Sequence, residues 1–278
     1  MKYAFNTCAF GSCNAWLPAY PLDETMRRLA KVGYEAIELV CASPHAWPEF
    51  LSNDDIKRIG AWQKEYGVNI VSLMPLMGGG GPGCNVASSC KEELEWSRGY
   101  YKSCVDLAAR WGAKTISYGA GWLSPDASPD ETRKLAMESL VQIGEYANEK
   151  GVIICIDPCS VLTEVVDTVH DAMSMMKESG LSNVKVMFDM DFCYSNLLDP
   201  ADVALQMGKY LGHVQYCDRN RLAPGDGGYD FIPVTQTLKD MGYDGYITFE
   251  IGFSRNTQPM SAARKSLLYM RSIEKKLR

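Results

Sequence analysis

The feature that most constrains the fold is a regular alternation of short apolar segments with longer amphipathic ones along all 278 residues. Each pair takes about thirty residues, the length of a strand and a helix that returns to a parallel neighbour. Eight units can be counted, and their strand candidates are Tyr3 to Thr7, Ala36 to Val40, Asn69 to Leu73, Lys114 to Tyr118, Val152 to Ile156, Val184 to Phe188, His213 to Cys217 and Tyr246 to Phe249. The helix candidates begin near Asp23, Asp54, Glu92, Pro129, Glu164, Pro200, Val234 and Gln258.

Residues typical of helix ends mark the same units. Asn53, Ser128 and Asp199 each stand before a helix candidate with acidic residues in its first turn, as N-caps do. Glycines precede six of the strands, where a left-handed residue ends a helix: Gly33, Gly67, Gly112, Gly151, Gly180 and Gly242. No linker or low-complexity tract divides the chain. We therefore predict one domain, residues 1–278, folded as a (β/α)₈ TIM barrel, with a doubly wound open sheet as the alternative.

The composition of the chain argues against two classes of binding partner, nucleic acids and membranes. A net charge of −6 and a pI near 5.2 lack the basic surface that nucleic-acid binding needs, so nucleic acid is not expected as a partner. No apolar run approaches the ~20 residues of a membrane span, so no membrane is expected either. The first ten residues lack the pattern of a signal peptide, which favours a cytoplasmic protein. The ten cysteines are scattered along a long chain and are expected to be reduced thiols.

Carboxylates close three of the last four strand candidates. VIICID ends at Asp157, VKVMFD at Asp189 and YITFE at Glu250. In a barrel of this type the carboxyl ends of the strands carry the active site, and three carboxylates brought together there repel one another unless they are protonated, solvated or bound to a cation. With the amide oxygen of Gln215 as a neutral fourth ligand, the set suits Mn²⁺ or Mg²⁺ better than Zn²⁺. Helix caps or loop salt bridges are the structural alternative.

Other residues are placed by the same pattern at this face. His45 follows the second strand candidate and is a candidate proton carrier near neutral pH, with an ordinary loop histidine as the alternative. Trp16, Trp47 and Trp122 follow the first, second and fourth strands, where they would stack on a bound ligand or pack the core or a loop. His213 starts the seventh strand, and the family resemblance described next implies a satisfied core or strand-start histidine there rather than a metal ligand.

The most specific segments of the chain carry a family resemblance: GYEAIEL at 33–39, GVIICIDP at 151–158, VKVMFDMDF at 184–192, GHVQYCDRNRLAPGDGGYDF at 212–231 and GYDGYITFEIG at 242–252. Over nearly its whole length the chain resembles the sugar phosphate isomerase/epimerase superfamily, whose fold is the xylose isomerase-like barrel. It is most similar to the D-tagatose and D-psicose 3-epimerases within that superfamily.

The resemblance implies a metal site formed by Asp157, Asp189, Gln215 and Glu250. It also implies that Asp157 and Glu250 act as acid and base on opposite faces of a ketose while the metal stabilises the enediolate. The substrate-contacting arginine of the family falls on Arg221. Its sugar-contacting histidine falls on Phe192, so the substrate-binding set predicted here is Arg221, His45, Trp122 and Phe192.

Two ligands depart from the epimerase pattern. Asp157 is one methylene shorter than the family's glutamate, and Gln215 replaces a metal-binding histidine, which weakens transition-metal binding. The leading hypothesis is an isomerase or epimerase that acts on a ketose or related sugar and depends on Mn²⁺, with Mg²⁺ or Co²⁺ as alternatives. Metal-dependent lyase-type cleavage of a modified sugar or glycoside, and a non-catalytic sugar-binding barrel, remain open. The resemblance also suggests a homo-oligomer, either a dimer or a tetramer.

Overall fold

The computed structural model describes residues 1–11, 19–76, 84–159, 162–252 and 258–278. Eight parallel strands close into a barrel in sequence order, each paired with its neighbours and β8 with β1. The strands are β1 (Lys2–Asn6), β2 (Ala36–Val40), β3 (Asn69–Met74), β4 (Thr115–Tyr118), β5 (Ile153–Ile156), β6 (Val184–Asp189), β7 (Leu211–Tyr216) and β8 (Tyr246–Phe249). The predicted TIM barrel is confirmed, and its closure excludes the doubly wound open sheet.

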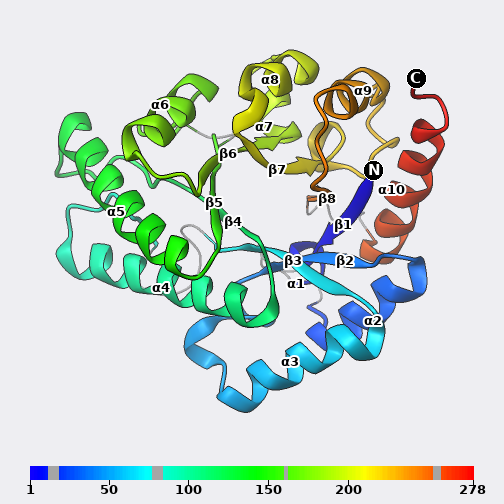
Figure 1. Cartoon of the computed structure of the whole chain (residues 1–278), viewed down its shortest axis with the longest axis horizontal. Coiled ribbons are helices and arrows are strands. Elements are labelled where there is room, and N and C mark those ends of the chain that lie inside the picture. The colour runs from blue at the N-terminus through cyan, green and yellow to red at the C-terminus, as the bar shows by residue number, and fades with distance from the viewer. Residues whose placement is uncertain (12–18, 77–83, 160–161, 253–257) are drawn as a thin grey trace.

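Helices form a ring outside the barrel (Figure 1). They are α1 (Cys8–Gly11), α2 (Leu22–Val32), α3 (Asn53–Tyr66), α4 (Lys91–Trp111), α5 (Pro129–Glu149), α6 (Val169–Ser179), α7 (Met190–Ser195), α8 (Pro200–Met207), α9 (Ile232–Asp240) and α10 (Pro259–Glu274). Short 3₁₀ turns add η1 (Pro48–Phe50), η2 (Gly208–Tyr210) and η3 (Arg219–Arg221). A continuous apolar core lies between strands and helices. Among the described residues, no helix has both the length and the apolar character needed to cross a bilayer.

The predicted end signals explain several helix boundaries. Ser128 caps α5 in a capping box with Glu131, and Asp199 caps α8. The six glycines predicted to end helices all have positive φ, from 67° to 106°. At α3 the prediction was one residue late, because Ser52 is the N-cap and Asn53 is the first helical residue.

One helix start was wrong. The chain does not become helical near Glu164, which has φ of 60°. Instead, the carboxylate of Asp167 accepts the backbone N–H groups of Thr163 and Glu164 and so holds a turn. α6 begins at Val169 after the N-cap Thr168. Helix α7, directly after β6, was not predicted.

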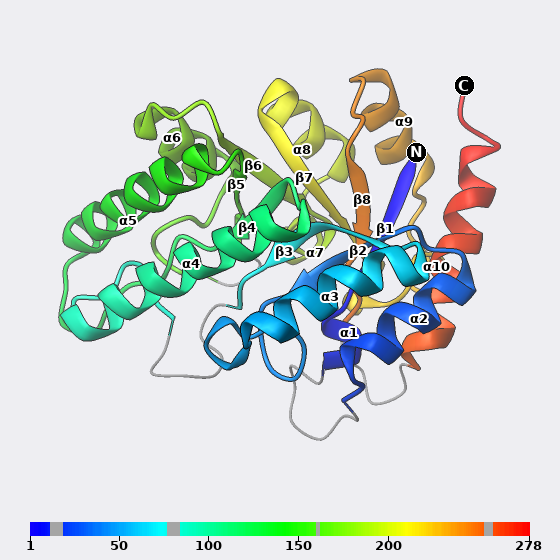
Figure 2. The same ribbon diagram turned by 60° about the horizontal axis from the view of Figure 1, so that its bottom comes forward.

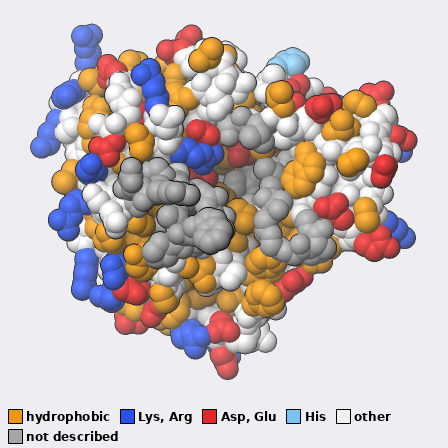
Figure 3. All heavy atoms as spheres, turned by 180° about the vertical axis from the view of Figure 1, so that it is seen from behind, with side chains coloured by type: hydrophobic (Ala, Val, Ile, Leu, Met, Phe, Trp, Pro, Cys, Tyr) orange, Lys and Arg blue, Asp and Glu red, His pale blue; other side chains and the backbone are white. Residues whose placement is uncertain are grey.

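The buried thiols fit the predicted reduced state. Cys41, Cys104, Cys155, Cys193 and Cys217 are free and buried among apolar side chains. In the tilted view of Figure 2, the described segments that follow the strands gather at one end of the barrel. Figure 3 looks onto that face and shows a hollow near its centre with charged side chains at its edge.

Candidate active site

The three predicted carboxylates meet at the carboxyl end of the barrel. Asp189 ends β6, while Asp157 and Glu250 follow β5 and β8 directly. Their backbone N–H groups continue the sheet: that of Asp157 donates to the Tyr118 carbonyl at 2.9 Å, and that of Glu250 to the Tyr216 carbonyl at 3.1 Å. Strand pairing therefore sets where these carboxylates project.

One cavity of about 210 Å³ brings the carboxylates together with Arg221. Its described lining is Met74, Pro75, Leu76, Ser117, Gly119, Asp157, Cys159, Asp189, Arg221 and Glu250. The lining combines an apolar wall from the end of β3 with a charged wall from β5, β6 and β8. A cavity of this size with convergent polar groups suits a small polar ligand.

Arg221 is the basic partner of these acids. Its Nη1 lies 2.9 Å from Oε2 of Glu250, its Nε donates to Oδ2 of Asp191 at 3.0 Å, and its Nη2 lies 3.8 Å from Oδ2 of Asp189. The side chain is 29% exposed. One guanidinium thus bridges the ends of β6 and β8, an arrangement that the planar, five-donor geometry of arginine permits.

The loop that carries Arg221 is organised around a buried carboxylate. Asp218 accepts the backbone N–H groups of four residues at 2.8 to 3.2 Å: Arg219, Gly225, Gly227 and Tyr229. Arg221 itself has φ of 54°, a left-handed conformation that is uncommon for a residue with a side chain. The Gly252 N–H donates to the Arg221 carbonyl at 2.7 Å, which ties this loop to the segment after β8.

Burial and mutual repulsion raise the pKa of the cavity acids. For all three carboxyls, the loss of hydrating water on burial is the largest cause of the raised pKa. The pKa of Asp189 rises to about 7, although the nearby charge of Arg221 opposes the shift. The pKa of Asp157 rises well above its ordinary value, with further repulsion from Asp189 and Glu250. Oδ1 of Asp157 is buried and has no hydrogen-bond partner among the described residues.

These observations fit a bound cation. A buried carboxylate oxygen without a donor is costly, and a divalent ion would both satisfy it and relieve the repulsion. As their side chains stand, the described residues contain no group of three or more His, Cys, Asp or Glu placed to hold a metal ion. The ion-pair contacts of Arg221 with Glu250 and Asp189 occupy part of the acids' oxygen capacity.

Gln215 lies beside these acids but does not line the cavity. It is paired in register with Asp189 and its side chain is buried in the barrel. Its Nε2 donates to Oε2 of Glu38 at 2.8 Å. Predicted to be a ligand through its oxygen, Gln215 is thus held by its nitrogen from across the barrel, and its role as a ligand stays a prediction.

Glu38 is a residue that sequence reasoning did not single out. Its carboxylate is fully buried, and Asn6, Ser72, His213 and Gln215 all approach it within 2.9 Å. His213 thus lies in the barrel interior with its Nε2 2.9 Å from Oε1 of Glu38, and it is not part of the described lining of the carboxylate cavity. The available signal was an acidic residue inside the otherwise apolar strand AIELV, because a buried charge must find partners.

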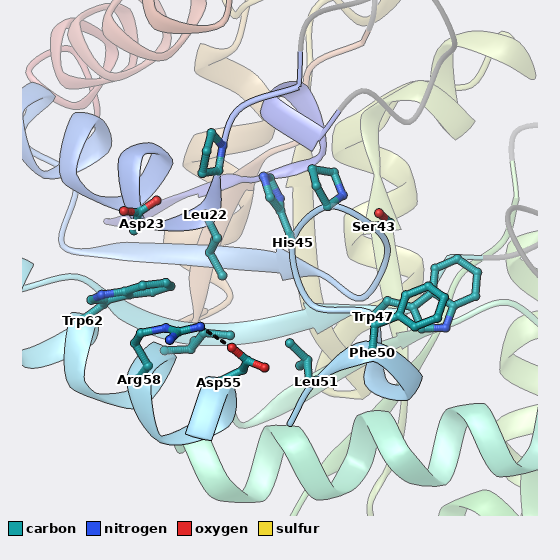
Figure 4. Close-up of a pocket in the computed structure, with 13 residues that line it drawn as sticks. Leu22, Asp23, Ser43, His45, Trp47, Phe50, Leu51, Asp55, Arg58 and Trp62 are labelled. Atoms are coloured by element: carbon teal, nitrogen blue, oxygen red, sulfur yellow. Dashed lines mark hydrogen bonds and ion pairs between the residues drawn. The ribbon is translucent and has the colours of Figure 1, made fainter. Parts of the chain in front are cut away.

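The predicted substrate-binding residues are dispersed. Arg221 lines the cavity, whereas His45 lies in a separate pocket of about 310 Å³ with Trp47, Phe50 and Trp62 (Figure 4). Nε2 of His45 hydrogen-bonds to the Tyr20 carbonyl at 3.0 Å, and burial lowers the pKa of its imidazole to about 4.

That low pKa contradicts the predicted proton carrier near neutral pH, because a buried imidazole without a charged partner stays neutral there. Phe192 is packed in the core at 1% exposure. Trp122 follows β4 in a loop whose backbone is bonded to Asn85. Among described residues, neither Phe192 nor Trp122 lines the carboxylate cavity. Trp16 lies outside the described residues.

Comparison with known proteins identifies the family to which this barrel belongs. Residues 26–273 match the family described as the xylose isomerase-like TIM barrel. The chain belongs to this family. The family match and the closed eight-stranded barrel confirm the fold that the sequence resemblance implied.

Relatives of this xylose isomerase-like chain include sugar epimerases. The 3-dehydro-D-guloside 4-epimerase of Escherichia coli K12 is 29% identical over 180 residues, covering 60% of this chain and 68% of that protein. The D-psicose 3-epimerase of Enterocloster bolteae is 24% identical over 84% of this chain and 77% of its own length. The fructoselysine 3-epimerase of Shigella flexneri is 24% identical over 91% of this chain and 93% of its own.

Solved structures agree on the fold. The apo 3-keto-D-glucoside 4-epimerase of E. coli superposes with a TM-score of 0.81 at 22% identity, covering 98% of this chain and 99% of that one. A D-psicose 3-epimerase crystallised in the presence of D-fructose gives 0.83 at 18% identity, with the same coverage.

Proposed function

We propose that this chain is a divalent-metal-dependent epimerase or isomerase that acts on a ketose or a related sugar. The observation that carries the proposal is the single cavity lined by Asp157, Asp189, Glu250 and Arg221. Three carboxylates at the carboxyl ends of barrel strands provide both cation ligands and groups that exchange protons with a substrate. The names of the three relatives described above, each an epimerase of a sugar or sugar derivative, support this choice of substrate class.

Asp157, Asp189 and Glu250, with the Gln215 amide oxygen, would hold the cation, with Mn²⁺ as first choice and Mg²⁺ or Co²⁺ as alternatives. When bound, the cation supplies Lewis-acid polarisation of the sugar carbonyl and stabilises the negative charge of the enediolate.

The proton steps belong to the chain's own side chains. Glu250 takes the proton from the carbon next to the carbonyl, and Asp157 returns a proton on the opposite face. Burial raises the pKa of Glu250, and the charge of Arg221, 2.9 Å away, opposes that rise and so favours the ionised form that acts as a base. The same guanidinium offers donors to sugar hydroxyl oxygens.

The test is a product analysis. Protein stripped with chelator and reloaded with Mn²⁺ is incubated with a panel of ketoses, 3-keto glycosides and fructosyl amino acids, and the products are separated and weighed. Epimers of unchanged mass are expected. Fragments of lower mass would replace the proposal with lyase-type cleavage. Substrate binding without any conversion would favour a sugar-binding barrel.

A further inference from the structure

The interior of the barrel holds a polar cluster that the proton steps above do not use. Glu38 is its centre, at 0% exposure. Its Oε1 lies 2.9 Å from both Ser72 Oγ and His213 Nε2, while its Oε2 lies 2.9 Å from Asn6 Nδ2 and 2.8 Å from Gln215 Nε2. Oε2 therefore accepts two amide N–H groups, while Oε1 accepts the Ser72 hydroxyl and faces the imidazole of His213.

The direction of these hydrogen bonds follows from chemistry. Asn6 Oδ1 accepts the backbone N–H of Cys8 at 2.8 Å, so the amide nitrogen of Asn6 is the atom that faces Glu38. The same oxygen of Glu38, Oε2, lies 2.8 Å from Nε2 of Gln215. A carboxylate oxygen accepts hydrogen bonds and an amide nitrogen donates them, so Gln215 presents its nitrogen to Glu38 as Asn6 does.

A fixed nitrogen also fixes the role of the amide oxygen. The Nε2 of Gln215 is committed to Glu38, so Oε1 is the atom of this amide left for another partner. Gln215 is paired in register with Asp189, one of the cavity carboxylates, so the two residues lie side by side on neighbouring strands.

We propose that Glu38 is a positioning residue that holds the nitrogen of Gln215 and thereby reserves the amide oxygen for the divalent cation. Glu38 sets the donor type of the fourth ligand, so that the site offers oxygen only and suits a hard ion such as Mn²⁺ or Mg²⁺. The inference rests on the proposed function, because it requires a cation at the carboxylates.

The decisive variant is Glu38→Gln, which keeps the shape of the side chain but both donates and accepts hydrogen bonds. An amide at position 38 no longer dictates which atom of Gln215 it meets. Ser72→Ala is the matched control, because it removes a partner of the other oxygen of Glu38 and leaves the bond to Gln215 in place. Gln215→Leu removes the proposed ligand while leaving Glu38 intact.

The experiment measures Mn²⁺ affinity by the EPR signal of free Mn²⁺, together with the rise in melting temperature that Mn²⁺ causes. Wild type and Ser72→Ala are expected to bind one Mn²⁺ with affinities within about twofold of each other. Glu38→Gln and Gln215→Leu are expected to bind at least about tenfold more weakly, and the double variant no more weakly than either single one, since both act on one ligand. A purely structural Glu38 would lower the melting temperature without changing its Mn²⁺-induced rise.

The outcomes separate the two proposals. Wild-type protein that binds no Mn²⁺ would overturn the proposed function. Wild-type protein that binds Mn²⁺ while Glu38→Gln binds it equally well would overturn the role of Glu38 alone. If Glu38→Gln does not fold by circular dichroism, Glu38→Asp is measured in its place; it keeps the charge but withdraws the carboxylate from Gln215, and unchanged Mn²⁺ affinity would again overturn the role.

Discussion

Nη1 of Arg221 lies 2.9 Å from Oε2 of Glu250, and Nε of the same guanidinium donates to Asp191 at 3.0 Å. Asp191 belongs to α7, just after β6, so one side chain ties together the carboxyl ends of two strands that are not neighbours. The contact places the only described basic residue of the cavity lining against the proposed catalytic base.

Replacing Arg221 by lysine tests this bridge. A lysine keeps the charge, but its single ammonium group does not reproduce the planar fork that meets Asp191 and Glu250 together. Loss of one charge-assisted hydrogen bond is expected to lower kcat/KM about 10- to 100-fold. The control is Arg133→Lys, in an ion pair with Glu178 on the outer helices. Steady-state kinetics that give the two variants equal activity would contradict the assigned role.

Gly252 is required for the position of Arg221. A Cβ added at Gly252 would overlap the Cβ of Arg221, where two backbone segments meet. Gly252→Ala is expected to cost about 1–3 kcal/mol of unfolding free energy and to lower activity by displacing the arginine. The control is Gly99→Ala in α4, where nothing lies within 4 Å of an added Cβ and helix propensity favours alanine. Urea unfolding curves that are equal for both variants would refute the requirement.

Cation binding is expected to depend on pH. In the metal-free protein, burial raises the pKa of Asp189 to about 7, so this carboxyl holds a proton below that pH and a cation must displace it. Mn²⁺ affinity should therefore fall by about tenfold for each pH unit below 7 through the proton displaced from Asp189. Calorimetric titrations between pH 5.5 and 8 measure this. An affinity that is constant over that range would contradict the account.

His45 gives a separate pH dependence of folding stability. Burial lowers the pKa of His45 to about 4, so between pH 6.5 and 4 the unfolded chain binds a proton that the folded chain does not. The contribution of neutral, buried His45 to the free energy of unfolding is therefore fully present above pH 6.5. It falls by about 3 kcal/mol in all as the pH drops from 6.5 toward 4. His45→Gln removes this component. Wild-type stability relative to His45→Gln should therefore decline over this range, and parallel curves would show otherwise.

Much of the fold was predictable because its signals are local. Alternating apolar and amphipathic segments located all eight strands, and glycines such as Gly33 and Gly112 marked helix ends because their left-handed conformation is a property of one residue. The start of α6 was missed because a side chain, that of Asp167, captured the backbone groups that a helix would otherwise use.

The candidate active site was likewise predictable from the sequence only in part. Asp157, Asp189 and Glu250 were found because strand ends converge in any parallel barrel. The link between Glu38 and Gln215 joins residues 177 positions apart, and no periodicity in the sequence reports which strands face each other across a barrel. His45 was predicted to act at the active site because its loop follows a strand at the carboxyl end of the barrel. The sequence does not reveal that its side chain turns into a separate pocket.

The most direct test of the account is solvent exchange at carbon. Mn²⁺-loaded wild-type protein is incubated in D₂O with the ketose found by the product screen, and product mass is followed over time. We predict an epimer one mass unit heavier, formed at least about a hundredfold more slowly by Glu250→Gln at saturating Mn²⁺ and at the wild-type rate by the exposed control Glu149→Gln. An epimer without solvent deuterium, or a fully active Glu250→Gln, would contradict proton transfer by Glu250.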